Sequence, residues 1–334
     1  MTLAFDYTNG FHDASNIIAG VIAARAMTPT QAVLLVAGFE FLGPLLGGTA
    51  VANTVGTLVD FSAIPKVDAL LIILAGLFAA VLWNLFTWWQ GLPSSSSHAL
   101  VGGLIGATLT GIGNAPIAWG FQDLNGGQLI GFSKILLALL ISPLLGFLLG
   151  YAIQRLTMFL LRAAHPRINT PLRHGQWLTT AALAFSHGAN DAQKSMGILT
   201  LILLLNGDID HFQVPLWVTL LCAAALTAGA LTGGWRIVRT LAFSIYKIRP
   251  LHALNSQLTA CSVIFGSSLL GAPVSTTHVV ASSIMGIGAS EHPKLVHWSK
   301  AWEILRAWLT TIPGSAVFAC YSYLLFDYLL PATH

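Results

Sequence analysis

The sequence predicts an all-α polytopic membrane protein made of two inverted-topology repeats, with about five membrane segments in each repeat. Charged residues make up only 8% of the 334 residues, against about 25% in an ordinary soluble domain, and the mean hydropathy is +0.75. Uncharged stretches long enough to cross a bilayer, such as 69–89, recur along the chain. Two polar motifs each occur twice, in the same order and at nearly the same spacing, which indicates an internal duplication.

The apolar stretches place the individual membrane segments. Ten are expected, near 3–24, 31–58, 69–89, 98–111, 135–161, 177–205, 215–235, 252–271, 277–288 and 301–330. The fourth and the ninth are short, follow a proline and are rich in glycine, which is typical of one arm of a re-entrant hairpin or of half of a broken helix. A total of 10 to 12 segments is therefore predicted, with broken or re-entrant helices at the motifs.

The boundary between the two repeats lies at a polar stretch. Residues 1–162 form the first predicted repeat, 163–176 a cytoplasmic linker with two prolines, and 177–334 the second repeat of one integrated transmembrane domain. With both termini outside, only Lys66 and Lys134 of the 15 basic residues fall in outer loops, as the positive-inside rule requires. An odd number of segments per half inverts the second repeat, so equivalent motifs can meet near the bilayer midplane.

The first repeated motif places an aspartate inside a membrane segment, Asp13 in the first half and Asp191 in the second. An ionised side chain at that depth is costly unless it is paired or hydrated, so such residues mark transport paths. An ion pair between Lys194 and one carboxylate is the purely structural alternative. The side chains expected to support the two aspartates are His12, Asn16, Asn190, Gln193 and Lys194.

A glycine stands three residues before each aspartate, at Gly10 and Gly188. Glycine there permits a broken helix or a close approach of another backbone, and in membrane helices it also allows tight packing. Glu40 is a further ionisable residue within an apolar segment, and no counterpart is evident in the second half. It is expected to line the path or to serve a subunit contact.

The second repeated motif is a run of small hydroxyl residues that follows Pro93 or Pro273 and begins a helix. Backbone N–H groups at a helix N-terminus form an anion site, although N-capping by serine and threonine is the structural alternative. His98 and His278 end the runs and are expected to hydrogen-bond the backbone or to titrate near the site. The hydroxyl residues expected to bind an oxyanion are Ser95, Ser96, Ser97, Ser275, Thr276 and Thr277.

Both motifs, above all GANDAQK at 188–194 and PVSTTH at 273–278, resemble the inorganic phosphate transporter (PiT) family over essentially the whole chain. The resemblance implies a transporter rather than an enzyme, with inverted repeats and outward-facing termini, that carries inorganic phosphate in symport with a cation and is commonly a homodimer. The chain is similar to the compact bacterial branch, which implies import across the bacterial plasma (inner) membrane. The net charge of +3 resides in loops and indicates no nucleic-acid partner.

The two copies of the first motif differ in a way that concerns the coupling ion. In sodium-coupled relatives the motif reads GANDVAN and each copy ends in asparagine, whereas here the copies end in Asn16 and Lys194. A fixed ammonium would repel sodium and replace its charge, so a co-transported proton is predicted rather than sodium. No resident cofactor or metal is expected. Some members of the similar branch carry phosphate as a complex with a divalent metal, so metal–phosphate is an alternative cargo.

Selectivity and the competing functions follow from the same residues. A protonated phosphate oxygen can donate to Asp13 or Asp191 and sulfate cannot, so such a site would prefer phosphate. Sulfate permeation and sodium-coupled symport are the alternatives within transport, and a passive anion channel lacks the expected ring of basic residues. A membrane metalloenzyme fits poorly because its histidines form no HExxH-like pair. Its ligands would be His12, Asp13, His98, His187, Asp191 and His278.

Overall fold

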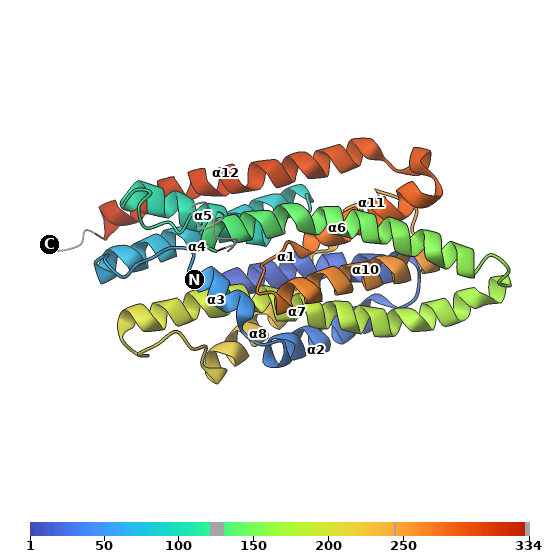
Figure 1. Ribbon diagram of the computed structural model, residues 1–334, viewed down its shortest axis with the longest axis horizontal. Coiled ribbons are helices and arrows are strands. Elements are labelled where there is room, and N and C mark those ends of the chain that lie inside the picture. The colour runs from blue at the N-terminus through green and yellow to red at the C-terminus, as the bar shows by residue number, and fades with distance from the viewer. Residues whose placement is uncertain (121–129, 244, 331–334) are drawn as a thin grey trace.

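The computed structural model describes residues 1–120, 130–243 and 245–330, and helices make up most of it (Figure 1). The first half contains α1 (Thr2–Ala23), α2 (Pro29–Leu46), α3 (Ala50–Gly56), α4 (Lys66–Gln90), α5 (Ser96–Gly111) and α6 (Gly131–Leu160). The second half contains η2 (Pro166–Ile168), α7 (Asn169–Asn206), α8 (Leu216–Thr232), α9 (Trp235–Phe243), α10 (Pro250–Leu269), α11 (Thr276–Glu291), η3 (Pro293–Leu295) and α12 (Trp298–Leu329). These described residues contain no β-strand, which confirms the all-α class.

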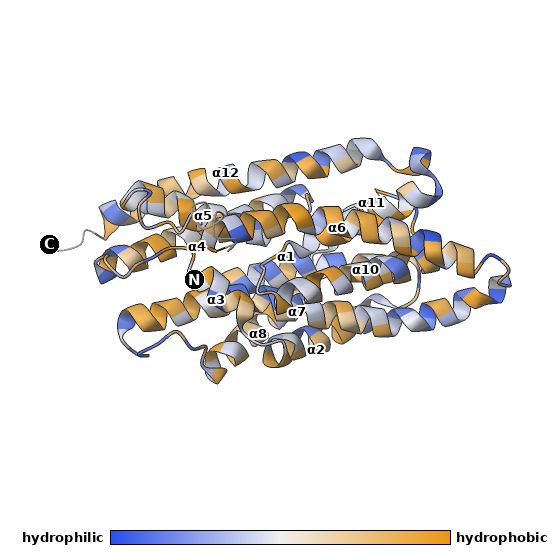
Figure 2. Cartoon of the chain, in the orientation of Figure 1, coloured by the Kyte–Doolittle hydropathy of each residue, from blue (hydrophilic) through white to orange (hydrophobic). Residues whose placement is uncertain are grey.

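Four helices are long and apolar enough to cross a membrane by themselves: α2, α4, α6 and residues 301–329 of α12. Figure 2 shows long apolar stretches along α4 and α6 and hydrophilic residues at the turn between α6 and α7. Helices α1 and α7 are also long, but the polar motif residues inside them lower their hydropathy. The apolar helices confirm that the chain is a membrane protein.

Two of the predicted segments are broken helices. The segment predicted near 31–58 consists of α2 and α3, with a break at Gly47–Thr49. Gly48 has φ +79° at this break, a conformation that residues with a side chain rarely adopt. The segment 215–235 likewise consists of α8 and the start of α9, and Gly233 at their junction has φ +59°.

Two helical hairpins contain the short fourth and ninth segments. Helices α4 and α5 pack against each other, as do α10 and α11. The tips of the hairpins touch, because Ser97 Oγ at the start of α5 donates to Val274 O just before α11, at 2.9 Å. Figure 1 shows α5 and α11 leading from the middle of the bundle toward opposite ends. The hydroxyl motifs therefore lie at hairpin tips inside the protein.

The aspartate motifs, in contrast, lie in unbroken helices, so the alternative of a broken helix at Gly10 and Gly188 is wrong. Both glycines permit close packing instead. A Cβ atom on Gly10 would collide with Leu226 O of α8, and one on Gly188 would collide with Glu40 O of α2. Gly10 and Gly188 thus have equivalent roles, because each lets a neighbouring helix approach closely. Leu226 of α8 has the same position in the first contact as Glu40 of α2 has in the second.

The two halves of the chain interleave. Helix α1 packs against α8, α7 against α2, α6 against α11, and α12 against α5, so each contact joins elements of different halves. The predicted linker 163–176 is only partly a connection, because its second part, from Asn169, forms the first turns of α7. The start of α1 and the end of α12 lie toward the same end of the bundle (Figure 1). The inverted relation of the repeats and the side on which the termini lie stay predictions.

Candidate functional site

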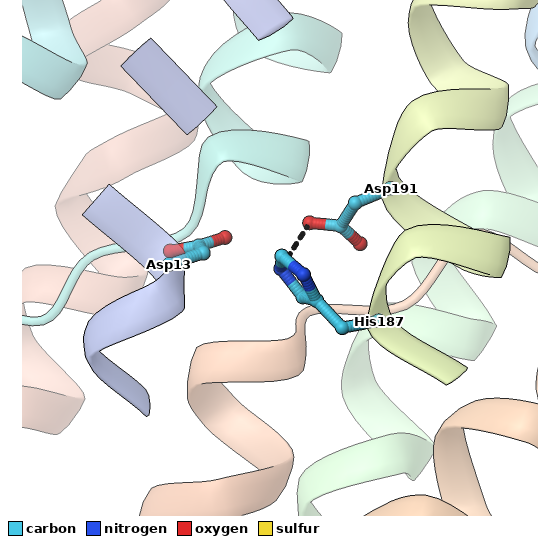
Figure 3. Close-up of side chains that lie close together, drawn as sticks. All are labelled: Asp13, His187 and Asp191. Atoms are coloured by element: carbon cyan, nitrogen blue, oxygen red, sulfur yellow. Dashed lines mark ion pairs between the residues drawn. The ribbon is translucent and has the colours of Figure 1, made fainter. Parts of the chain in front are cut away.

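The candidate site lies where the middles of α1 and α7 meet the two hairpin tips. Asp13 on α1 is 1% exposed and Asp191 on α7 is completely buried. Figure 3 shows the His187 side chain of α7 between the two aspartates. One ligand-type atom from each of Asp13, His187 and Asp191 lies within 4.8 Å of the others. The two aspartate motifs, far apart in sequence, therefore form one site.

Hydroxyl groups from both hairpin tips surround Asp13. Thr277 Oγ1 donates to Oδ1 at 2.9 Å, and Ser96 Oγ and Thr276 Oγ1 lie 3.0 and 3.4 Å from Oδ2. The amide of Asn16 donates to Thr277 Oγ1 at 2.8 Å and lies 3.4 Å from Oδ1. Asp13 thus holds hydroxyl donors of α5 and α11 together at one point.

Two further residues of α1 complete the surroundings of Asp13. His12 Nδ1 lies 2.7 Å from Asp13 Oδ1, and Asn9 Oδ1 accepts from Ser96 Oγ at 2.7 Å. Asn9 was not among the predicted site residues. It lies four residues before Asp13, on the same face of α1, and this spacing is the signal that could have found it.

Charged and titratable groups, rather than hydroxyls, surround Asp191. Lys194 Nζ donates to Asp191 Oδ1 at 2.7 Å and lies 3.3 Å from Val274 O. His187 Nε2 lies 3.3 Å from Asp191 Oδ2, but neither atom has a hydrogen-bond partner. The other ring nitrogen of His187, Nδ1, makes a short contact with Glu40 Oε1 of α2. The groups Glu40, His187, Asp191 and Lys194 therefore form a continuous buried chain.

Glu40 and His187 were not placed at the oxyanion site by the sequence. His187 lies four residues before Asp191, on the same helix face, where Asn9 lies relative to Asp13. The packing at Gly188 brings Glu40 to it, whereas the equivalent packing at Gly10 brings Leu226. Glu40, His187 and Lys194 thus collect beside Asp191, whereas hydroxyl and amide groups, together with the imidazole of His12, collect beside Asp13.

The remaining hydroxyl residues of the second motif have structural bonds. Ser95 Oγ and Ser275 Oγ accept from the backbone N–H groups of His98 and His278, at 3.2 and 3.3 Å, and so N-cap α5 and α11. Ser97 Oγ bonds Val274 O across the two tips. Ser96, Thr276 and Thr277 are therefore the predicted hydroxyls that reach an aspartate.

His98 and His278 form a separate buried pair. Their ring centroids lie 4.6 Å apart, and the His278 ring stacks on Trp308 of α12 at 3.8 Å. They do not belong to the group formed by Asp13, His187 and Asp191. Of the six ligands of the metalloenzyme alternative, only that group of three comes together among the described residues, and Lys194 already occupies one oxygen of Asp191.

Asn190 and Gln193 fix backbone segments next to the site. Asn190 Nδ2 donates to Ser268 Oγ at 2.9 Å, and Asn190 Oδ1 accepts from Val274 N at 3.3 Å, which ties the second hairpin to α7. Gln193 Oε1 accepts from Val51 N at 2.8 Å, at the break between α2 and α3. The equivalent residue of the first half, Ser15, donates to Gly234 O at the break between α8 and α9, at 2.8 Å.

Two solvent-facing hollows lie near the ends of the motif helices. One, of about 610 Å³, is lined by Thr57, Phe61 and Phe212 and by the last turns of α7. The other, of about 520 Å³, is lined by the end of α1 and by Tyr246, Arg249 and other residues of the same loop. A hollow of about 10 Å³ reaches Asn16 and shares Ile248 with the second of them. Asp13 and Asp191 are closed off from solvent.

A closed polar site at the meeting point of two hairpin tips, inside a bundle of apolar helices, defines a membrane transporter for a small ion. The chain belongs to the phosphate transporter family, whose sequence model matches residues 9–319. Membership places it among transporters rather than enzymes.

Two relatives and one solved structure show how far the similarity extends. A protein of Bacillus subtilis named as a probable low-affinity inorganic phosphate transporter is 39% identical over 97% of this chain and 95% of its own length. A protein of Rhizobium meliloti with the same name is 37% identical over 98% of this chain and 95% of its own. The structure titled the sodium-dependent phosphate transporter has the same fold, with a TM-score of 0.81, 21% identity and 98% of each chain covered.

Proposed function

We propose that this protein imports inorganic phosphate across the bacterial plasma membrane by symport with protons. The contact of 2.7 Å between Lys194 Nζ and Asp191 Oδ1 carries the proposal, because a fixed positive charge stands where the first half has Asn16. The relatives named as inorganic phosphate transporters support phosphate as the cargo. An inverted repeat, outward termini and a homodimer belong to the same proposal.

Phosphate binds, in this proposal, on the Asp13 side of the site. The hydroxyls of Ser96, Thr276 and Thr277, which face Asp13 in the closed site, turn to the phosphate oxygens as the anion enters. A protonated phosphate oxygen then donates to Asp13, and the N-termini of α5 and α11 add positive dipole ends. Sulfate carries no proton at neutral pH, so Asp13 would repel it.

Protons bind on the Asp191 side. With a neutral imidazole, the chain of Glu40, His187, Asp191 and Lys194 holds two carboxylates against one ammonium. One added proton brings the net charge of this chain to zero, and burying neutral groups costs less free energy than burying charged groups. His187 Nε2 and Asp191 Oδ2, which have no hydrogen-bond partner, lie 3.3 Å apart and can share that proton. This arrangement requires no sodium ion beside Asp191, because the ammonium is already there.

Gradient-driven uptake in liposomes tests this function. The purified chain is reconstituted, and uptake of labelled phosphate is measured with a proton gradient alone, a sodium gradient alone, or neither, at clamped membrane potential. Accumulation that follows the proton gradient without sodium is expected. Accumulation that requires sodium and ignores the proton gradient would overturn the proton assignment, and stronger uptake of sulfate than phosphate would overturn the cargo.

Phosphate complexed with a divalent metal is a second candidate cargo, favoured by one observation. Asp13, His187 and Asp191 place oxygen and nitrogen atoms within 4.8 Å of one another, beside the hydroxyl donors, so both parts of a metal–phosphate complex would meet suitable partners. The discriminating measurement is phosphate uptake with and without magnesium. Co-transport of magnesium with phosphate supports this cargo, and uptake that is unchanged by a chelator excludes it.

A further inference from the structure

Asp6 is a buried carboxyl group of α1 that the proposed mechanism does not use. It precedes Asp13 by two helical turns on the same face of the helix. The residue is completely buried. Ser195 Oγ of α7 donates to Asp6 Oδ1 at 2.6 Å, whereas Asp6 Oδ2 has no hydrogen-bond partner. One oxygen of a membrane-buried carboxyl group is therefore left unsatisfied.

The groups around Asp6 do not compensate a negative charge. The Cys222 thiol of α8 faces the Asp6 carboxyl. Asp191 and Lys194 of α7 carry opposite charges, so their electrostatic effects on Asp6 oppose each other. The Lys194 ammonium is bonded to Asp191 and not to Asp6. Cys222 belongs to a buried apolar cluster whose other members are Ala52, Ala192, Met196, Val218 and Leu226. An ionised carboxylate that has no bonded cation and one oxygen without a hydrogen bond is unstable in such surroundings, and a protonated carboxyl group is not.

The geometry points to Asp6 as a second proton-binding site of the transport cycle, separate from the Glu40–His187–Asp191 chain. This inference rests on the proposed proton coupling. A proton suits the place better than a metal cation, which takes several oxygen ligands, because Asp6 is offered one hydroxyl and one thiol. The free Oδ2 is where the acidic proton would reside.

The position of Asp6 links proton binding to the central site. Asn9, whose Nδ2 has no partner, lies between Asp6 and Asp13 on α1. Ser195, the donor to Asp6, directly follows Lys194. A change in the charge of Asp6 is therefore felt both by the Lys194–Asp191 pair and along α1. Asp6 also lies nearer the start of α1 than the cargo position, so a proton from that side meets Asp6 first.

The number of protons carried per phosphate tests the inference in reconstituted full-length protein. Phosphate accumulation at a gradient of about one pH unit, with the membrane potential clamped, is compared for wild type, Asp6→Asn and the exposed control Asp210→Asn. Each co-transported proton multiplies the attainable accumulation by the proton ratio, so Asp6→Asn should lower it about tenfold. Exchange of labelled phosphate at equal pH should persist in all three proteins.

The outcomes separate this inference from the proposed function. A wild type that ignores the proton gradient overturns proton coupling altogether, and the role of Asp6 with it. A proton-driven wild type whose accumulation equals that of Asp6→Asn leaves the function standing and overturns the role of Asp6 alone.

A second variant keeps the test decisive if Asp6→Asn proves inactive. Ser195→Ala removes a hydrogen bond donated to the charged form of Asp6, so Asp6 should hold its proton to higher pH and the pH profile of uptake should shift upward. The matched control is Ser262→Ala, an exposed serine of α10. Infrared spectra of the wild type should show a protonated carboxyl band that moves in Asp6→Glu. An unmoved band together with an unshifted profile would overturn the inference.

Discussion

The ammonium of Lys194, a buried residue three positions after Asp191 on α7, lies 2.7 Å from a carboxylate oxygen of Asp191. At the equivalent place in α1, the uncharged amide of Asn16 lies 3.4 Å from Asp13 and bonds Thr277 instead. Two similar motifs thus form two chemically different halves of one site. In the function proposed above, the half with hydroxyl donors binds the anion, and the half with charged groups binds the proton.

Replacing Lys194 by asparagine gives both halves the same residue and should change the coupling. We expect Lys194→Asn to lose at least about tenfold of its proton-driven phosphate uptake, and we expect added sodium to restore part of it. The physical reason is that Asp191 would lose its bonded cation, and removing one partner of a buried pair costs about 3–5 kcal/mol. The measurement is uptake in liposomes with separate proton and sodium gradients.

Lys66→Asn is the control for that experiment, because Lys66 is an exposed lysine at the start of α4. It should transport like the wild type. Proton-driven uptake that survives unchanged in Lys194→Asn would contradict the role given to the ammonium.

The hydroxyl of Thr277 should contribute to phosphate affinity rather than to coupling. Thr277→Val keeps the shape of the side chain and removes the donor that faces Asp13 at 2.9 Å. A hydrogen bond to a charged group is worth about 1.5–3 kcal/mol, so KM for phosphate should rise about tenfold or more while the ratio of protons to phosphate is unchanged. Thr310→Val, on the exposed face of α12, is the matched control and should leave KM as it is.

Asp13 and Asp191 should differ when each is replaced by asparagine. Asp13→Asn removes the acceptor for a protonated phosphate oxygen, so sulfate should compete better with labelled phosphate than it does in the wild type. Asp191→Asn should act mainly on the dependence of uptake on the proton gradient. Competition by sulfate and gradient-driven uptake, measured in both variants, check this division. The same phenotype in both would show that the two halves are equivalent.

The sequence predicts much of this architecture because membrane segments and duplicated polar motifs are local patterns. Hydropathy places the helices, and the short segments after Pro93 and Pro273 indicate the hairpins. The meeting of Asp13 with Asp191 is expected from the duplicated motifs and the predicted inversion of the repeats. None of these conclusions requires knowing how one side chain packs against a distant helix.

Other features depend on contacts between distant parts of the chain, and the sequence does not reveal them. The break between α2 and α3 lies in an apolar stretch, and the carboxamide of Gln193, far along the chain, satisfies the backbone there. The proximity of Glu40 to His187 likewise arises only because α2 packs at Gly188. The neutral counterpart of Glu40, Leu226, becomes evident from the equivalent packing at Gly10.

The packing glycines predict a stability effect that is independent of transport. Gly10→Ala and Gly188→Ala should each destabilise the protein by about 1–3 kcal/mol, because the added methyl group meets the backbone of the neighbouring helix. Gly38→Ala in α2 is the control, since nothing lies within 4 Å of the position of its added Cβ. That change should be neutral or slightly stabilising, because alanine favours helix over glycine. Thermal unfolding in detergent measures all three, and equal melting temperatures would contradict the packing.

A polar cluster fixes the loop that lines the wider hollow near the end of α1. Tyr246 OH donates to Glu291 Oε2 at 3.2 Å, and Gln154 Nε2 donates to Oε1 of the same carboxylate at 3.0 Å. Burial and the neighbouring Glu291 raise the pKa of Tyr246, so its hydroxyl keeps its proton at neutral pH and remains a donor. Two residues further along the loop, Ile248 lines both the hollow that reaches Asn16 and the wider hollow beyond it. The bond between Tyr246 and Glu291 thus holds the loop that separates these two hollows.

Tyr246→Phe should therefore let this loop move more often and join the two hollows. Losing a hydrogen bond to a carboxylate shifts such an equilibrium by about 1.5 kcal/mol at the low end of the usual range, or about tenfold. Ser256, which lines the small hollow, can report the opening as Ser256→Cys, in a background without the native cysteines. An impermeant thiol reagent should label it about tenfold faster when Tyr246→Phe is present. Tyr151→Phe, on the exposed side of α6, should leave the rate unchanged, and equal rates in both double variants would show that Tyr246 holds no barrier closed.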